Sequence, residues 1–228
     1  MLDVDAEVRN AWGARATQLR AVNDVETRRA YSLASASPDN PGRLILNVRL
    51  MMPGGDATDA VAGTGSTYLW GLRSSGSLDI FGPLGSFHAG PGESDMVVIG
   101  GGAGMAPLRA IIRDQLLHRQ STRRIDYWYG ARTRADLFYV EELDELQAKH
   151  ENFAWQPVLS EPLGSDGWDR PKGLVHEAIH EGYLRHHPDP GACEFFVCGP
   201  PLMLEATRRM LASLGVPAQR ILFDDFGT

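Results

Sequence analysis

One stretch constrains the fold of this chain more than any other. Residues 96–107 read Met-Val-Val-Ile-Gly-Gly-Gly-Ala-Gly-Met-Ala-Pro, and Leu108, Ile111 and Leu116 follow at helical spacing. An uncharged apolar run followed by glycines predicts a buried strand, a tight turn and a helix. Glycine allows a ligand to approach the backbone closely, and the free N–H groups of a helix start attract phosphate. We therefore predict a pyrophosphate site at Gly101, Gly102, Ala103, Gly104, Met105 and Pro107.

Taken alone, this glycine turn is a weak signal. From Gly102 the sequence reads Gly-Ala-Gly-Met-Ala-Pro, which departs from the dinucleotide fingerprint G-x-G-x-x-G. No Asp or Glu follows at the end of the next predicted strand to hold a ribose. A tight strand-to-helix turn without a ligand stays open at this point.

The rest of the C-terminal half alternates between apolar runs and amphipathic stretches. Strands are predicted near 96–100, 125–130, 153–160, 194–198 and 221–225, and helices near 107–119, 135–149, 173–184 and 201–214. This alternation predicts an α/β domain with a five-stranded parallel sheet, and ligands bind beyond the carboxyl ends of such strands. Gly102, Gly130, Ser160 and Gly199 should therefore gather along one edge, whereas Trp128, Tyr129 and Trp155 are expected in the core.

The N-terminal part has a different pattern. Arg28 to Ser35 and Leu44 to Leu50 are β-rich and predict a hairpin, with Leu78 to Phe81 as a further strand. A short helix is predicted to begin at Ser66-Thr67, with a hydroxyl as its cap. Gly90-Pro91-Gly92 indicates a joint, so the predicted domains are residues 1–92 and 93–228.

Composition excludes several classes of function. The chain of 228 residues has a formal net charge of −7 and no Lys/Arg cluster beyond pairs, which argues against nucleic-acid binding. Cys193 and Cys198 are the only cysteines, too few to ligate an iron–sulfur cluster or to form a disulfide scaffold. No apolar run approaches the roughly 18 residues of a membrane helix. The composition predicts a soluble cytoplasmic protein.

Several short motifs occur in a fixed order along the chain. They are Arg29-Ala30-Tyr31-Ser32, Gly63 to Thr67, Gly101 to Pro107, Cys198-Gly199-Pro200-Pro201 and the ending Asp224-Asp225-Phe226-Gly227. In this order they resemble the ferredoxin–NADP reductase superfamily, in which a β-barrel flavin domain precedes a nicotinamide-nucleotide domain. Within it, Leu-Asn-Val-Arg and Trp-Tyr-Gly-Ala-Arg are also similar to the reductase part of the F subunit of the sodium-translocating NADH:quinone reductases.

The resemblance implies which residues bind FAD. It places Arg29 on the pyrophosphate, Tyr31 against the isoalloxazine and the Ser32 hydroxyl near flavin N5. It implies a partial antiparallel barrel in residues 1–92 and assigns Phe226 to cover a flavin face, with core packing as the alternative for that ring. The implied FAD site is Arg29, Ala30, Tyr31, Ser32, Asn47, Val48, Gly63, Ser66, Thr67 and Phe226.

The resemblance also implies the nicotinamide site. Cys198 would lie beside the nicotinamide C4 and set the geometry of hydride transfer, so Ser32 and Cys198 are the implied catalytic residues. Arg132, Gly199 and Pro200 complete the implied NADH site with the glycine turn. Two arginines, Arg132 and Arg134, with no acid could indicate NADPH, but the resemblance favours NADH.

The implied function is a flavoprotein reductase that passes a hydride from NADH to FAD and single electrons to a 2Fe-2S cluster and a quinone. The cluster domain, a membrane helix and the first barrel strands would precede Met1, and the partners would be subunits of a respiratory complex at the bacterial inner membrane. Unpaired barrel edges predict weak flavin retention, aggregation or a dimer. The alternatives are a reductase component of an oxygenase and a non-catalytic nucleotide-binding module.

One motif points to other chemistry. His176-Glu177-Ala178-Ile179-His180 matches H-E-x-x-H, and His186 falls where a longer zinc motif has a third ligand. Tyr183 stands where that longer motif requires glycine. We therefore expect two solvent-facing histidines and no metal.

Overall fold

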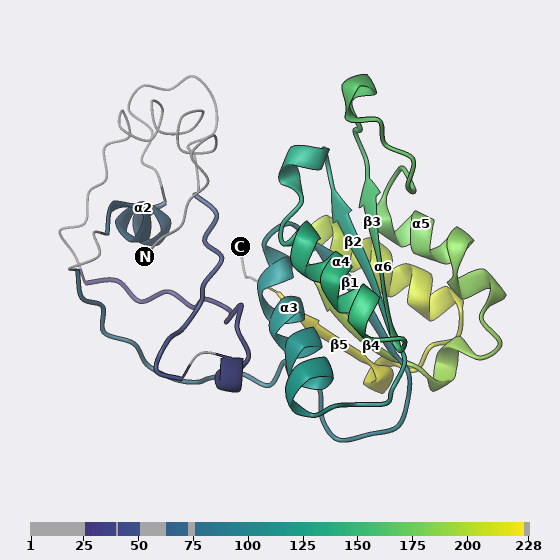
Figure 1. The fold of residues 1–228 in the computed structure, drawn as a ribbon, viewed down its shortest axis with the longest axis horizontal. Coiled ribbons are helices and arrows are strands. Elements are labelled where there is room, and N and C mark those ends of the chain that lie inside the picture. The colour runs from purple at the N-terminus through teal and green to yellow at the C-terminus, as the bar shows by residue number, and fades with distance from the viewer. Residues whose placement is uncertain (1–25, 40, 51–62, 73–75, 226–228) are drawn as a thin grey trace. The chain divides into compact units, whose positions relative to one another are not determined.

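The computed structural model describes residues 26–39, 41–50, 63–72 and 76–225 (Figure 1). The chain divides into two compact units. The first unit comprises Met1–Tyr31 and Val48–Gly85, and the second comprises Ser32–Asn47 and Ser86–Thr228. The second unit thus takes in a segment from the N-terminal part, which a division by sequence at residue 92 does not anticipate. The assignment of residues 1–92 to a flavin domain and of 93–228 to a nucleotide domain stays a prediction.

The second unit contains a five-stranded parallel sheet, as predicted. Every neighbouring pair in the order β3-β2-β1-β4-β5 is parallel. β1 and β4 are buried along almost their whole length because helices cover both faces of the sheet. The strands are β1 Met96–Gly101, β2 Ile125–Ala131, β3 Phe153–Leu159, β4 Glu194–Cys198 and β5 Ile221–Asp224.

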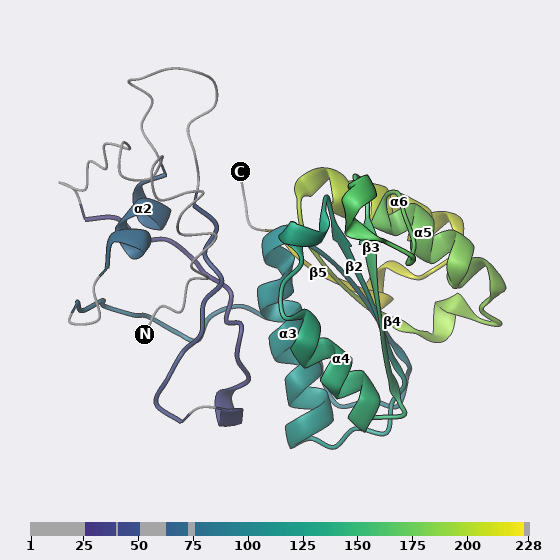
Figure 2. The ribbon, with the colours of Figure 1, turned by 45° about the horizontal axis from the view of Figure 1, so that its top comes forward.

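Four helices complete a three-layer arrangement. Side chains of α3 Met105–Arg113 and α4 Val140–Lys149 pack into the core on one face of the sheet, and those of α5 Val175–Gly182 and α6 Pro201–Ser213 pack on the other (Figures 1 and 2). A π-helical turn, Asp114–His118, continues α3. The single-turn 3-10 helices are Ser37–Asp39, Gly102–Gly104, Arg134–Asp136, Gly164–Asp166, Leu184–His186, Pro190–Ala192 and Ala218–Arg220.

The predicted helices and the core aromatic residues are confirmed with small shifts of boundary. α3 begins at Met105, so Pro107 lies in its first turn, where a missing N–H costs nothing. α4 begins at Val140 rather than near residue 135, because Tyr139 before it adopts a left-handed φ of 54°. Trp128, Tyr129 and Trp155 are buried, as expected.

The β-rich pattern before residue 92 gives much less strand than predicted. Within the described residues, Leu33 and Leu46 form one isolated antiparallel bridge, and neither Arg28–Ser35 nor Leu44–Leu50 forms a strand. The same correction applies to Leu78–Phe81, which forms no strand. A two-stranded hairpin is marginal without a third strand or a covering helix, which explains why alternation alone was insufficient.

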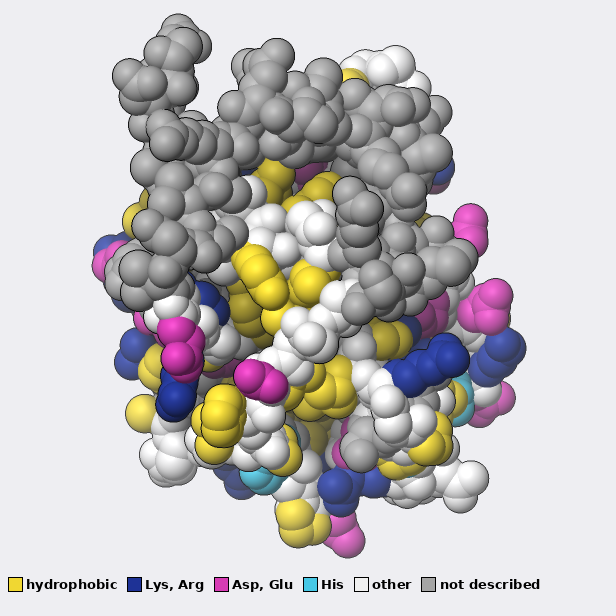
Figure 3. Space-filling model, turned by 90° about the vertical axis from the view of Figure 1, so that its left-hand side faces the viewer, with side chains coloured by type: hydrophobic (Ala, Val, Ile, Leu, Met, Phe, Trp, Pro, Cys, Tyr) yellow, Lys and Arg dark blue, Asp and Glu magenta, His cyan; other side chains and the backbone are white. Residues whose placement is uncertain are grey.

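The first unit contains one helix among its described residues, α2 Thr64–Gly71. It begins two residues before the predicted Ser66, and Gly63 is its N-cap without a side-chain cap, so the predicted hydroxyl cap is wrong. Farther along this unit, Phe81 and Leu84 are 70% and 89% exposed. Figure 3 shows hydrophobic side chains reaching the surface between charged ones on one face of the molecule.

None of the helices among the described residues is both long and apolar enough to span a bilayer.

Candidate functional site

The strand order places a topological switch point between β1 and β4. The chain runs outward from β1 to β2 and β3 and then returns to place β4 on the other side of β1. In open parallel sheets, ligands bind beyond the carboxyl ends of the strands at such a switch point. β1 ends in the glycine turn and β4 ends at Cys198, with Gly100 and Cys198 in register. The two motifs that the sequence singled out therefore lie next to each other.

Packing explains why glycine is required in this turn. A Cβ on Gly104 would lie 2.1 Å from the carbonyl oxygen of Cys198, a backbone atom that has no freedom to move aside. Gly102 has a φ of 54°, a conformation that favours glycine, and a Cβ there would meet nothing within 4 Å. The Tyr129 hydroxyl donates a hydrogen bond to the Gly102 carbonyl at 2.9 Å. Packing against Cys198 and the hydrogen bond from Tyr129 hold the turn in place, and the Gly102 position is open to a ligand.

Two helices start without a side-chain cap at this edge of the sheet. Gly104 is the N-cap of α3 and Pro200 is the N-cap of α6, and neither start has a side-chain hydrogen bond. In α3 the Met105 N–H bonds to carbonyl groups of the preceding 3-10 turn, and in α6 neither Pro200 nor Pro201 has an N–H. The helix dipole adds positive potential at both starts. Two such starts after neighbouring strands suit a diphosphate.

Cys198 is fully buried at the end of β4. Burial, with further contributions from the carboxylates of Asp224 and Asp225, raises the pKa of its thiol well above the ordinary range. Cys198 is therefore a neutral thiol at physiological pH and a poor nucleophile. Its place fits the role of positioning a ligand rather than attacking one.

The structure brings the two residues predicted to be catalytic to the same edge of the sheet. The Ser32 hydroxyl donates a hydrogen bond to Asp224 Oδ2 at 3.0 Å, and Asp224 at the end of β5 is in register with Cys198. Sequence reasoning missed this role of Asp224. The only signal for it was the Asp224-Asp225-Phe226-Gly227 ending itself. Phe226, the predicted flavin cover, lies outside the described residues.

Asn47, another predicted flavin residue, has an unusual environment. Its Oδ1 accepts a hydrogen bond from the Tyr139 hydroxyl at 2.7 Å. Its Nδ2 is buried and has no hydrogen-bond partner in the described part of the chain. A buried amide donor without an acceptor costs about 1–3 kcal/mol, so an acceptor supplied by a ligand would relieve it. Asn47 thus fits an acceptor-rich group such as the flavin ring.

The predicted FAD residues of the first unit cluster around the start of α2. A Cβ on Gly65 would lie 2.9 Å from Arg29 Cγ and 3.0 Å from the Tyr31 hydroxyl oxygen. Burial, opposed in part by the charge of Arg29, raises the pKa of Tyr31. Val48 accepts a hydrogen bond from Trp70 Nε1 at 3.2 Å, through its backbone carbonyl. Arg29, Tyr31 and the glycine-led helix start are therefore neighbours, as a shared ligand requires.

The hydroxyls at the α2 start are directed inward. Ser66 Oγ donates to the Gly63 carbonyl at 3.1 Å, and Thr67 Oγ1 donates to the same carbonyl. Each hydroxyl proton would have to turn away from Gly63 to reach a phosphate. The backbone N–H groups of the first turn remain the simpler phosphate donors, and the part of Ser66 and Thr67 in FAD binding stays a prediction.

The region after β2 contains an acid that the sequence analysis overlooked. Arg132 lies 3.8 Å from Asp136 Oδ1 as an exposed i,i+4 pair. Asp136 also forms a capping box with Thr133, accepting hydrogen bonds from its N–H and its hydroxyl. Asp136 lies on the 3-10 turn and not at the end of β2, where the sequence offers no acid, so the choice between NADH and NADPH stays a prediction.

Met203 was not foreseen as a site residue. Its thioether lies over the glycines at the ends of β1 and β4, and a Cβ on Gly101 or Gly199 would approach its Sδ to 2.7 and 2.9 Å. No sequence motif indicated this contact, because Met203 is one apolar residue among several at the start of α6.

The H-E-x-x-H stretch lies on α5, as expected. A small groove between α5 and α6 is lined by His176, His180 and neighbouring acids, and His180 Nδ1 is 2.9 Å from Glu181 Oε1. Among the described residues, no three His, Cys, Asp or Glu side chains are grouped as a metal site.

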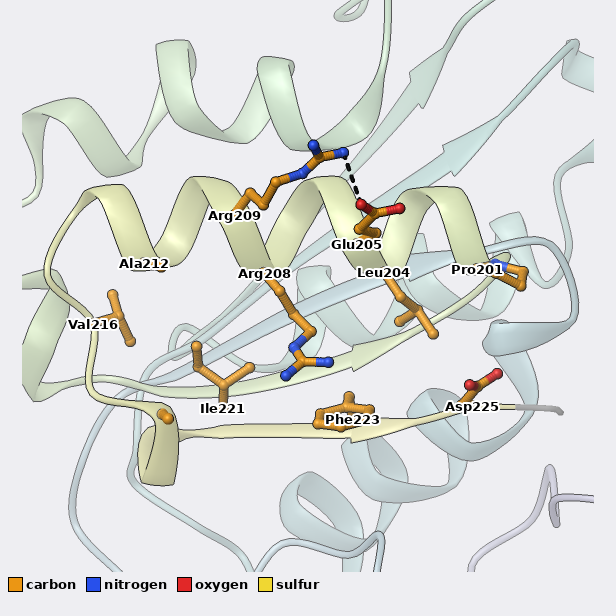
Figure 4. A pocket seen from close by; sticks show the side chains of 11 residues that line it. Pro201, Leu204, Glu205, Arg208, Arg209, Ala212, Val216, Ile221, Phe223 and Asp225 are labelled. Carbon is orange, nitrogen blue, oxygen red and sulfur yellow. Dashed lines mark ion pairs between the residues drawn. The ribbon is translucent and has the colours of Figure 1, made fainter.

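A larger groove of about 430 Å³ runs between α6 and the edge strand β5 (Figure 4). It is mainly apolar, with Leu204, Ile221 and Phe223 in its wall, and the Arg208 guanidinium lies 4.5 Å from the centre of the Phe223 ring. At one end are Pro201 and Asp225, and Pro201 directly follows the predicted residue Pro200. The rest of the groove lies away from the predicted nucleotide residues.

Comparisons with known proteins agree with this arrangement. The family model described as the oxidoreductase NAD-binding domain matches residues 98–209. The F subunit of the Na(+)-translocating NADH-quinone reductase of Haemophilus ducreyi is 47% identical over 199 residues, which are 87% of this chain and 48% of the relative. The chain thus spans about half the length of this curated relative.

Two solved structures are similar over 90% of the chain. The Amycolatopsis cytochrome P450 reductase GcoB has a TM-score of 0.68 and 32% identity, and 58% of its chain is covered. The Flavohem-like FAD/NAD-binding domain of the nitric oxide dioxygenase from Vibrio cholerae has a TM-score of 0.72 and 26% identity, with 79% of its chain covered.

Proposed function

Because the chain belongs to the ferredoxin–NADP reductase superfamily, we propose that it is a reductase module that takes a hydride from NADH onto bound FAD. The flavin supplies the chemistry that converts a two-electron donor into single electrons. The observation that carries the proposal is that the glycine turn, Cys198 and Ser32 lie at the same carboxyl-terminal edge of the sheet, next to its switch point.

The chain's residues have distinct tasks in this proposal. The glycine turn and the positive end of the α3 dipole bind the NADH pyrophosphate, and the open face of Gly102 admits it. Cys198, a neutral thiol, contacts the nicotinamide and excludes water from the reacting carbon. Ser32, oriented by its hydrogen bond to Asp224, holds its hydroxyl near flavin N5. The close packing of these groups sets the orientation on which hydride transfer depends.

FAD fits the remaining predicted residues. The buried Asn47 Nδ2 needs an acceptor, and the edge of an isoalloxazine ring offers carbonyl oxygens and ring nitrogens. Arg29 and the backbone N–H groups at the start of α2 suit the FAD phosphates, with Tyr31 beside them for stacking. Ala30, Val48, Gly63, Ser66 and Thr67 complete this proposed site.

NADH is the proposed donor rather than NADPH. Arg132 is close to a carboxylate, Asp136, which lowers the local attraction for a 2′-phosphate and offers an acceptor for a ribose hydroxyl. Reversal of this preference is expected when Asp136 is replaced by Ser, because Arg132 and Arg134 would then face the ribose without that acid.

The electron acceptor is proposed from the similarity to the F subunit of the NADH-quinone reductases. Electrons would leave FAD singly for a 2Fe-2S cluster carried outside this chain and then reach a quinone, in a complex at the cytoplasmic face of a bacterial inner membrane. A second candidate is the reductase of an oxygenase, which the 32% identity to a cytochrome P450 reductase favours. Reduction of a purified ferredoxin-type or haem partner by NADH, compared with that of a soluble quinone, separates the two.

An anaerobic titration tests the proposed activity. The chain is incubated with FAD, freed of excess cofactor and mixed with NADH, and the flavin absorbance is followed. We expect FAD to be retained and bleached by one equivalent of NADH, with Cys198→Ala slowing bleaching more than it weakens NADH binding. A chain that binds NADH but stays colourless would support the non-catalytic binding module, and one that binds neither contradicts the proposal.

The predicted association through the N-terminal part is retained as a proposal. Its support is now the exposure of apolar side chains, Ile80, Phe81 and Leu84, because the strands expected there do not pair. Light scattering over a range of concentrations tests it, and a monomer that retains FAD at all of them would exclude it.

A further inference from the structure

The segment Ser32–Asn47 of the second unit is hydrogen-bonded at both of its ends to the later part of that unit, residues 86–225. At one end Ser32 donates to Asp224 Oδ2, and at the other Asn47 accepts from Tyr139. Leu33 and Leu46, one residue inside each end, form an antiparallel bridge. Both end residues belong to the proposed FAD site. Their positions are therefore set by side chains of the unit that carries the proposed NADH site.

Arg109 on α3 makes contacts near both ends of the segment. Its Nη1 donates to the backbone carbonyl of Ala34, two residues after Ser32. Its guanidinium lies 4.3 Å from the centre of the Tyr139 ring, whose hydroxyl binds Asn47. Its Nε and Nη2 donate to Glu142 Oε2 at 3.2 and 2.6 Å. One side chain thus contacts the backbone at one end of the segment and the ring that holds the other end.

We infer that Arg109 is a positioning residue for bound FAD. By fixing Ala34 and Tyr139, it keeps Ser32 and Asn47 at fixed positions relative to the nucleotide-binding sheet. This inference rests on the proposed function. It assigns a role in the reaction to a side chain that no motif indicated and that is not among the predicted coenzyme-binding residues.

The energetics favour a positional role over a purely stabilising one. Arg109 is only 7% exposed, and burying a guanidinium is costly even with a carboxylate partner. Replacing a buried ion pair by well-packed apolar residues is often neutral or stabilising, so stability alone does not require an arginine here. An arginine does offer a planar fork that can hold a carbonyl, a carboxylate and a ring at fixed angles.

The backbone at Tyr139 supports the same conclusion. Tyr139 has a φ of 54°, a left-handed conformation that costs a residue with a side chain on the order of 1–3 kcal/mol. Such strain persists only where surrounding contacts hold it. For Tyr139 these contacts include the Arg109 guanidinium and Asn47, together with packing against the core and the Leu143 N–H that donates to its carbonyl. The strained residue is therefore the one through which Arg109 reaches Asn47.

A second ion-pair cluster braces the middle of the segment. Asp39, with a side chain only 3% exposed, accepts two hydrogen bonds from Arg113 at 2.7 and 3.0 Å and lies 2.7 Å from His118 Nε2. Arg113 also donates to Glu142 Oε1 at 2.9 Å, so Glu142 joins this cluster to Arg109. These ion pairs hold the middle of the segment against α3 and the π-helical turn, so that its two ends can be aligned.

The test compares Arg109→Met and Arg109→Lys with the wild-type chain. The matched control is Arg119→Met, which removes an arginine that pairs with Asp114 at 2.5 Å but is 53% exposed. Hydrogen exchange by mass spectrometry reports on residues 32–47 without any cofactor. Single-turnover kinetics with NADH and with 4-deuterated NADH report hydride transfer, and reduction of the same FAD by dithionite serves as a reference reaction.

We expect Arg109→Met to increase exchange in residues 32–47 and to slow hydride transfer about 10- to 100-fold, since small misplacements carry penalties of that size. Dithionite reduction should stay within about twofold, and the deuterium isotope effect should increase as chemistry becomes limiting. Arg109→Lys keeps the charge but loses the fork, so an intermediate loss is expected. Arg119→Met should leave all of these values unchanged.

Other outcomes would contradict either this inference alone or the proposed function as well. Normal exchange in residues 32–47, or normal hydride transfer, in Arg109→Met overturns the inference while leaving the proposed function intact. A wild-type chain that binds neither FAD nor NADH overturns both. If Arg109→Met does not fold, Arg109→Lys and Tyr139→Phe decide, and equal slowing of the NADH and dithionite reactions in both means that the role is structural only.

Discussion

Two helices of this chain begin at glycine-rich turns that are both proposed to hold phosphate, yet they are fixed in different ways. α3 starts at Gly104, which packs against the backbone of Cys198, and most of the helix is buried. α2 starts after Gly63, and Ser66 is its one buried residue among those described. Its Gly65 packs against the side chains of Arg29 and Tyr31.

The difference separates elements held by packing from elements held by a few polar or side-chain contacts. The glycine turn before α3 packs against the core of the sheet, which holds its shape. The start of α2 and the segment Ser32–Asn47 depend on individual side chains, so a bound cofactor can contribute much to their order. We therefore expect substitutions in the first class to act on folding and those in the second class to act on binding or geometry.

The largest effect is predicted for Gly104→Ala. The new methyl group would lie 2.1 Å from the Cys198 carbonyl oxygen and 2.4 Å from its carbon, so β1, β4 or α3 must shift. We expect a loss of about 3 kcal/mol or more in the free energy of unfolding, at the upper end for overpacking. Urea unfolding followed by circular dichroism measures it.

Gly164→Ala is the matched control for that experiment, because a Cβ there would meet nothing within 4 Å. It should change the free energy of unfolding by no more than about 0.5 kcal/mol. A Gly104→Ala variant as stable as this control would mean that the turn is not held by packing. The proposed difference between the starts of α3 and α2 would then be wrong.

A smaller effect on stability is predicted for Asp39→Asn, in the class held by polar contacts. Burial alone would raise the pKa of Asp39, but hydrogen bonds from Arg113 and His118 outweigh it and lower the pKa from 3.8 to about 2. A lowered folded-state pKa contributes stability that is present above the unfolded value and is lost as the pH falls through the folded value. The contribution is about 2 kcal/mol at neutral pH.

The pH dependence distinguishes this contribution from a general packing defect. Asp39→Asn should be less stable than wild type by about 2 kcal/mol at pH 7, and the difference should shrink between about pH 4 and pH 2. Asp114→Asn, which loses a pair with the exposed Arg119, should cost under about 1 kcal/mol. A difference for Asp39→Asn that is the same at both ends of this pH range contradicts the assignment.

The same two classes explain what the sequence could and could not predict. All five strands of the sheet were predicted to within about two residues, because each is an apolar run bounded by turn residues and followed by a helical pattern. The neighbouring positions of the glycine turn and Cys198 followed from the rule that ligand sites lie at the carboxyl ends of parallel strands. Local pattern and packing point to the same structure there.

The polar contacts could not be predicted in this way. Ser32 and Asp224 are 192 residues apart, Tyr139 and Asn47 are 92 apart, and Arg109 and Ala34 are 75 apart. No periodicity reports such partners, and a buried arginine looks like any surface charge of a helix when only its neighbours in sequence are known. The predicted hairpin failed for a related reason, since alternation does not specify a partner strand.

The smallest effect is predicted for Gly65→Ala, the counterpart of Gly104→Ala in the other class. A methyl group there would displace Arg29 and Tyr31, whose side chains can move, and alanine favours the helix by about 1 kcal/mol over glycine. We therefore expect little change in stability but an FAD dissociation constant about 10-fold higher, equivalent to about 1.4 kcal/mol. Flavin fluorescence titration measures it, with Gly71→Ala, where a Cβ meets nothing, as the control. Unchanged FAD affinity in Gly65→Ala, or a loss of stability as large as that of Gly104→Ala, would show that the two helix starts are fixed in the same way after all.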